Sequence, residues 1–170
     1  MTRDELERIV VKYMDSMTTM TLAGCIDEKP WAAAVYYARR VFDLIFFSSP
    51  SSRHSMIFAH NPRAAATIHG DYKGWKEIKG LQMEGEVKLI SGTTARTKAL
   101  AMYLKRYPFV REFFSDSAAV SLSVAKKVAG VDLYNFRPEY ILYMDNSCGF
   151  GNRWKMEIRN GQIVGDPVKE

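Results

Sequence analysis

The chain has 170 residues, of which 47% are hydrophobic and 25% charged, and this composition excludes disordered, collagen-like and coiled-coil chains. Two cysteines are too few for a disulfide framework, and no uncharged apolar stretch reaches the ~18 residues that a membrane span needs. The charged N-terminus does not resemble a signal peptide, so we expect a cytoplasmic protein. The net charge of +5 favours an anionic partner, either a phosphorylated small molecule or nucleic acid.

The sequence predicts a helix at the N-terminus. Thr2 and Glu5 have the spacing of a capping box, in which each side chain accepts a hydrogen bond from a free backbone N–H at the helix start. Apolar residues then recur at helical spacing and predict one buried stripe. They are Leu6, Ile9, Val10, Tyr13, Met14 and Met17.

Three strands are predicted next, with turns between them. The strands are Thr19–Ile26, Trp31–Tyr37 and Phe42–Phe47, and the turns are 27–30 and Arg39-Arg40. Because parallel strands need long crossover connections, the short connections predict an antiparallel meander.

The rest of the chain mixes helices with strands. A short helix is expected to end near His60, before Asn61-Pro62. Further strands are expected at 64–69, 78–90 and 140–144, the last introduced by 136–139, with one more candidate strand at 154–158. A helix is predicted around Arg96–Tyr107, followed after Pro108 by a short apolar segment, Phe109–Phe114. The sequence thus predicts a mainly β (α+β) fold, a six-stranded antiparallel β-barrel flanked by helices.

The segment Ser48–His54 is the most informative for function. It places four serines, Arg53 and His54 where a strand turns into a helix. Serine hydroxyls, a guanidinium and the positive end of a helix dipole all suit the oxygens of a phosphate. The alternative is a solvated loop in which Ser52 only caps the helix.

This segment resembles the pyridoxamine 5'-phosphate oxidase-like FMN-binding split barrels. The resemblance is carried by Phe46–His54, by Asn61-Pro62-Arg63 after a short helix, and by Gly80–Gly85 on a later strand. It extends to Arg137–Tyr140 and the strand that follows. It implies that residues 1–170 form a single FMN-binding split-barrel domain, and that two chains form a homodimer with FMN at the interface.

The resemblance also implies a set of FMN contacts. The phosphate contacts are expected at Ser48, Ser52, Arg53 and His54, although the family usually has lysine at the last position. The strand 32–37 resembles the one that runs along the flavin ring, and other residues match positions near the ring or its cover. The ring contacts implied in this way are Val35, Tyr36, Tyr37, Phe47 and Gln82, and Trp154 is expected to cover the ring from the partner chain.

The sequence therefore predicts an FMN-dependent oxidoreductase, a reductase or oxidase acting on a small molecule. Oxidation of pyridoxamine phosphate itself is disfavoured, because the region 92–129 does not resemble the oxidase. One alternative is a non-catalytic FMN or haem binding or storage protein. Another is a nucleic-acid-binding barrel that uses the basic cluster Lys73, Lys76 and Lys79 around Trp75. No residue stands out as a general acid or base, and no metal site is expected, since the three histidines are loosely spaced. Cys25 is expected to be a small core residue.

Overall fold

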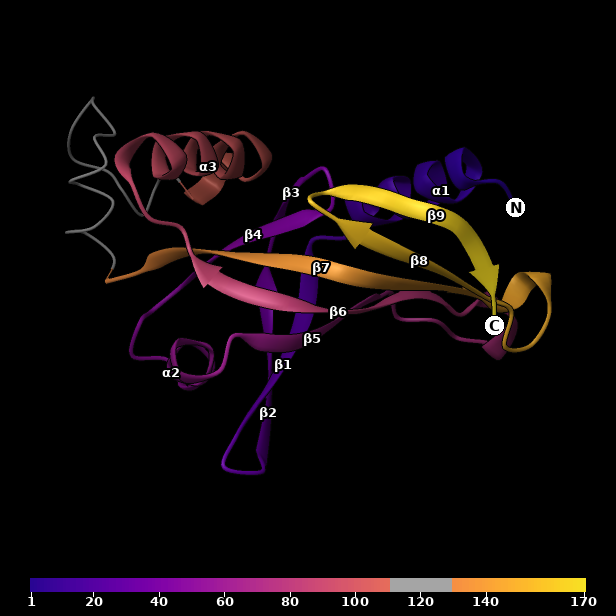
Figure 1. The fold of residues 1–170 in the computed structure, drawn as a ribbon, viewed down its shortest axis with the longest axis horizontal. Helices are drawn as coiled ribbons and strands as arrows, with labels where there is room; N and C mark the ends of the chain where they lie inside the picture. The colour runs from indigo at the N-terminus through magenta and orange to yellow at the C-terminus, as the bar shows by residue number, and fades with distance from the viewer. Residues whose placement is uncertain (111–129) are drawn as a thin grey trace.

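A strongly curled antiparallel sheet forms the body of the protein (Figure 1). The structure is a computed structural model that describes residues 1–110 and 130–170. Within these residues the strands follow the order β2-β1-β5-β6-β7-β4-β3, and β8 and β9 continue from β7. The strands are β1 (Thr19–Ile26), β2 (Lys29–Tyr36), β3 (Ala38–Arg40), β4 (Asp43–Ser48), β5 (Arg63–His69), β6 (Lys79–Leu89), β7 (Asp132–Asp145), β8 (Arg153–Arg159) and β9 (Gln162–Lys169). The mainly β class and the split-barrel form are confirmed.

The two ends of the strand order are joined by a single residue. β2 ends at Tyr36 and β3 begins at Ala38, so that one run of chain supplies both ends of the curled sheet. The predicted three-strand meander is therefore wrong. β1 pairs with β2 and β3 pairs with β4, but β4 takes β7 as its other neighbour rather than β2. Short connections showed that the pairs are antiparallel, but not that the chain crosses from one end of the sheet to the other.

One predicted turn is shorter than expected and another is displaced along the chain. Asp27 and Glu28 have φ values of 49° and 59°, and they alone make the turn between β1 and β2. Pro30 is tolerated inside β2, because this strand lies at one end of the order. Arg39 and Arg40 lie in β3 rather than in a turn, and Val41, with a φ of 56°, reverses the chain.

The strand count is higher than the six predicted, because nine strands lie in the described residues. β7 already includes the segment 136–139 that was expected only to introduce it. The candidate tail strand is confirmed as β8, and the turn at Asn160-Gly161 leads into β9. Cys25 is exposed rather than part of the core. The predicted apolar segment Phe109–Phe114 falls largely outside the described residues.

Three α-helices are described, and none of them is long and apolar enough to cross a membrane. α1 (Arg3–Ser16) has the predicted Thr2–Glu5 capping box and buries Leu6, Val10 and Met14 in the main core. α2 (Arg53–His60) buries Ile57 and Phe58 in the same core. α3 (Thr93–Arg106) covers a second apolar cluster with Ile45 and Leu133.

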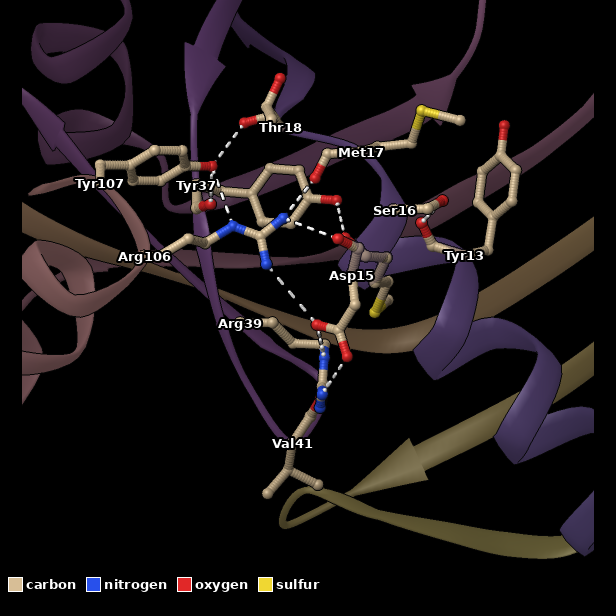
Figure 2. A network of polar contacts seen from close by, with 11 residues as sticks. Tyr13, Asp15, Ser16, Met17, Thr18, Tyr37, Arg39, Val41, Arg106 and Tyr107 are labelled. Carbon is tan, nitrogen blue, oxygen red and sulfur yellow. Dashed lines mark hydrogen bonds and ion pairs between the residues drawn. The ribbon is translucent and has the colours of Figure 1, made fainter. Parts of the chain in front are cut away.

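The C-terminal end of α1 is held by residues from elsewhere in the chain (Figure 2). The last carbonyls of a helix have no partner within the helix. The Arg106 guanidinium, at the end of α3, donates to the carbonyls of Asp15 and Met17, and the Tyr37 hydroxyl donates to the carbonyl of Met14. Arg39 of β3 forms a two-pronged ion pair with the Asp15 carboxylate, at 2.7 and 2.8 Å. The link between β2 and β3 is thus fixed to both helices.

Candidate phosphate site at the start of α2

Three serine hydroxyls and one imidazole form a connected cluster where β4 leads into α2. Ser48 lies at the end of β4, Ser52 caps the helix, and His54 and Ser55 lie in its first turn. The Ser52 hydroxyl donates to that of Ser55 (2.8 Å), which donates to that of Ser48 (2.9 Å). Ser48 Oγ lies 2.7 Å from His54 Nε2. The structure therefore brings three of the four predicted phosphate contacts together, and the sequence analysis had not singled out Ser55.

The Ser48 hydroxyl connects His54 to this cluster. It donates to the carbonyl of Ser49 at 3.3 Å and lies 2.7 Å from His54 Nε2, where a neutral ring accepts a hydrogen or donates its own according to its tautomer. Burial lowers the pKa of His54 below its usual value, which favours this neutral form. A phosphate would reverse the preference, since its negative charge favours the imidazolium.

Arg53 is the first residue of α2, and its side chain extends towards the hairpin of β1 and β2. Its guanidinium carbon lies 4.2 Å from the centre of the Trp31 ring, in cation–π contact. The side chain of Arg53 is exposed and Trp31 is 40% exposed, so the contact lies at the surface. Trp31 was not among the predicted site residues. Its place at the start of the strand after Pro30 gave no signal of this contact.

The N–H and O–H groups at this turn donate hydrogen bonds of the kind that phosphate oxygens accept. The amides of Arg53 and His54 are among the first four of α2, which the helix itself leaves without partners. The first turn of α2 has no acidic residue that would repel an anion. The serine hydroxyls, once they turn from one another towards a ligand, and the Arg53 guanidinium would complete with these amides a donor set suited to a dianion.

The predicted ring contacts on β2 lie in different environments. Val35 is half-buried against the main core, and Tyr36 is 51% exposed, with its ring edge-on to those of Tyr107 and Phe109. The side chain of Tyr37 is fully buried, and its hydroxyl, amide and carbonyl all have partners inside the protein. Within one chain, Tyr37 therefore helps to fix the C-terminal end of α1, as Figure 2 shows, and does not face the serine cluster.

The side chains of the remaining predicted contacts lie against other parts of the protein than the serine cluster. Phe47 is half-buried, and its ring packs edge-on against that of Tyr103 of α3, with the two ring centres 4.7 Å apart. Gln82 is exposed on the outer face of β6, in a shallow hollow of about 400 Å³ that it shares with small side chains such as Ala23 and Ala65. Trp154 of β8 lines a different cavity, against α1.

The basic cluster around Trp75 is only partly available to an anion. Trp75 is 52% exposed and carries Lys76 over its ring at 5.5 Å. The ammonium of Lys79 is 3.0 Å from the carboxylate of Asp145, which neutralises one of the three predicted cations.

No family model matches the chain, but individual relatives do. A UPF0306 protein of Haemophilus ducreyi is 31% identical over 133 residues, which cover 76% of this chain and 91% of that protein. The chain belongs to the UPF0306 family.

Solved structures establish the fold of this UPF0306 chain. A candidate pyridoxamine 5'-phosphate oxidase of Listeria innocua superimposes with a TM-score of 0.63 and 14% identity, over 82% of this chain and 98% of that one. HutZ, the haem storage protein of Vibrio cholerae, gives a TM-score of 0.64 and 14% identity, over 79% and 90%. The split-barrel fold that the sequence resemblance implied is therefore confirmed. Because these two neighbours differ in function, the fold does not select between them.

Proposed function

We propose that this UPF0306 chain binds FMN, with one FMN per chain, and that it is an FMN-dependent oxidoreductase acting on a small organic molecule. The observation that carries the proposal is the cluster of Ser48, Ser52, Ser55 and His54 at the start of α2, with Arg53 beside it. The split-barrel fold, which the candidate oxidase shares, supports it.

Different residues of the chain would bind the phosphate and the ring of FMN. Ser52 and the amides of Arg53 and His54 would hold the phosphate, and Arg53 would add a charge-assisted hydrogen bond. FMN when bound supplies hydride or single-electron transfer at its ring. The side-chain amide of Gln82 is a donor on an exposed face, suited to stabilising negative charge on a reduced ring. A single phosphate cluster fits FMN, with its one phosphate, better than FAD.

The proposal includes a homodimer with the cofactor at its interface. Trp31 and Tyr36 leave large aromatic surfaces exposed on β2, at 40% and 51%. The hollow beside Gln82 lies on an exposed face of β1, β5 and β6 with small side chains, which a second chain could approach closely. Light scattering should report twice the mass of one chain at low micromolar concentration, and a monomer would remove the shared site.

The visible spectrum of the purified protein and the identity of the released chromophore test the cofactor. We expect flavin absorption and FMN on denaturation. A strong Soret band would instead support haem storage, as in HutZ, and a failure of the apoprotein to bind added FMN at micromolar concentration would overturn the proposal. For activity, the bound flavin should be bleached by a reductant and restored by an acceptor over many turnovers. Flavin that binds but does not cycle would indicate a binding protein.

A further inference from the structure

A second cavity, of about 670 Å³, lies between α1 and the loop that joins β7 to β8. In Figure 1 this loop and the N-terminal half of α1 lie at the right, whereas α2, whose start carries the serine cluster, lies at the lower left. The volume of this second cavity lies within the ~300–1,000 Å³ that is usual for small-molecule sites. Its lining includes Arg8, Ile9, Lys12, Cys148, Asn152 and Trp154.

The floor and the rim of this cavity differ in chemistry. Ile9 and Trp154 are half-buried and pack against the main core, so they offer a flat apolar surface. Arg8 and Lys12 are exposed and stand one helical turn apart on α1. Cations four residues apart on a helix repel one another. An anion between them would relieve that repulsion.

Neither cation is neutralised by an ion pair in the described part of the chain. Glu5 also lines the cavity, and Arg8 contributes to lowering the pKa of its carboxyl. Hydrogen bonds with Thr2 dominate that shift, because the carboxylate accepts from the Thr2 amide in the capping box. With one carboxylate against two cations, the rim keeps a net positive charge.

Both walls of the cavity are fixed by hydrogen bonds that do not involve its lining cations. In the loop, the buried Asn146 donates to the carbonyl of Trp75 (2.9 Å) and accepts from the amide of Gly151 (3.1 Å). Asp145 accepts from the amide and the hydroxyl of Ser147. α1 is held at its start by the capping box and at its end by Arg106. The cavity is therefore preformed, which lowers the cost of binding.

We infer that this cavity is a binding site for a planar aromatic anion, with the ring on Trp154 and Ile9 and the acidic group between Arg8 and Lys12. The side-chain amide of Asn152 has no hydrogen-bond partner in the described residues and provides a further donor at the rim. The site does not depend on the proposed FMN function.

Titration with 2-naphthoate, followed by the indole NMR signal of Trp154, tests the inference. The signal is assigned by its loss in Trp154→Phe. We expect saturable shifts at Trp154, and binding about tenfold weaker for the neutral 2-naphthylmethanol, which lacks the charged group. Inorganic phosphate alone should leave the Trp154 signal unmoved. Equal binding of naphthoate and its neutral analogue, or shifts only at Trp31 and Trp75, would overturn the inference.

Paired variants separate the site from general charge effects. Arg8→Gln/Lys12→Gln should lower naphthoate affinity about tenfold and leave the neutral analogue unchanged. Arg3→Gln/Lys105→Gln removes the same charge from residues that do not line the cavity, and should bind naphthoate as the unaltered protein does. Arg53→Ala should also leave naphthoate binding intact, so that a failure of the FMN site and a failure of this one give different results. Equal losses in both double variants would contradict the assignment to Arg8 and Lys12.

Discussion

The guanidinium of Arg53 lies over the ring of Trp31, 4.2 Å from its centre, and this contact joins the first residue of α2 to the hairpin of β1 and β2. Arg53 comes from the helix and Trp31 from the adjacent strand, and Gly24, which pairs with Trp31, lies directly against Phe58 of α2. The helix that presents the candidate phosphate site is therefore positioned by β1 and β2. The contact with Trp31 holds the positive charge of Arg53 near the surface, where a ligand can reach it.

Arg53→Ala should weaken FMN binding roughly ten- to a hundredfold, because it removes a charge-assisted contact worth about 1.5–3 kcal/mol. Riboflavin, which lacks the phosphate, should bind the variant almost as it binds the unaltered protein. Flavin fluorescence titrations measure both affinities. Arg159→Ala, which removes an exposed charge from β8, serves as the control and should change neither. Equal losses for FMN and riboflavin would show that Arg53 supports the fold and not the phosphate.

Trp31→Ala should weaken FMN binding less than Arg53→Ala does, because it leaves the charge in place and removes only what holds it. A cation–π contact at an exposed site is worth about 0.5–1 kcal/mol. In the double variant the two effects should not add, since Trp31 acts through Arg53. Trp31→Phe, which keeps an aromatic face, should restore most of the affinity. Full additivity in the fluorescence titrations would separate Trp31 from the site.

FMN affinity should rise as the pH falls towards the depressed pKa of His54. Burial lowers that pKa, so the ring is neutral at neutral pH, and a bound phosphate would favour the protonated form. Riboflavin affinity should stay level over the same range, and His54→Asn should flatten the FMN profile. An unchanged FMN profile in this variant would place the titration elsewhere.

The same pKa predicts a loss of stability in acid for the ligand-free protein. Between the folded pKa and the ordinary value of ~6.5, the unfolded chain binds more protons than the folded one at His54, so the free energy of unfolding falls as the pH drops through that window. Urea denaturation on both sides of the window measures this. His54→Asn should lose less stability over that interval than the unaltered chain, and an identical loss would contradict the prediction.

Gly85→Ala should destabilise the fold by at least about 3 kcal/mol. Gly85 lies at the irregularity where β6 shifts register against β7, and a Cβ there would stand 2.0 Å from the backbone carbonyl oxygen of Arg137. A backbone atom cannot turn aside as a flexible side chain can. Gly74→Ala is the matched control, because a Cβ there meets nothing within 4 Å and its φ is −133°. Urea denaturation should find the control nearly neutral, and a comparable effect of the two substitutions would show that the sheet yields at Gly85.

Arg106→Ala should lower the free energy of unfolding by about 1–3 kcal/mol, because it leaves two carbonyls at the end of α1 without their donor. Arg106→Lys keeps the charge but cannot reach both carbonyls and Tyr107 at once, so it should recover only part of the loss. Thermal melts compare the three proteins. Full rescue by lysine would mean that charge alone, and not the shape of the guanidinium, fixes the end of α1.

The sequence was most informative where local chemistry decides the structure. The Thr2–Glu5 capping box and the Ser52 cap depend on neighbours within one turn, and both are found. Of the predicted buried stripe, Leu6, Val10 and Met14 are buried, whereas Ile9, Tyr13 and Met17 are only partly buried against the core. The serine cluster was predictable for the same reason, since Ser48 to His54 are adjacent in the chain. A turn was predicted at 27–30, but its reduction to Asp27 and Glu28 was not, because neither of these positive-φ positions carries a glycine.

The contacts that sequence analysis missed join distant parts of the chain. Arg53 on Trp31, Arg106 on the end of α1 and the cavity beside Trp154 each depend on how the curled sheet brings elements together. Strand spacing predicted antiparallel pairs but not which strands would be neighbours. The resemblance implies that Trp154 covers the cofactor from the partner chain, and within one chain Trp154 lines a cavity that does not include Ser52.

The single-residue link between β2 and β3 has a consequence for how the chain folds. β3 and β4 can form their hairpin early, but β4 pairs next with β7, where Phe46 lies opposite Tyr134. β4 is apolar on both faces, and Leu44, Ile45 and Phe46 are fully buried in the finished protein. During synthesis, the β7 side of β4 therefore has no partner until β7 has been made. Pairing between strands so far apart in the sequence forms slowly. The unfinished chain is most exposed to aggregation over that interval, and β4 is the segment through which it would aggregate.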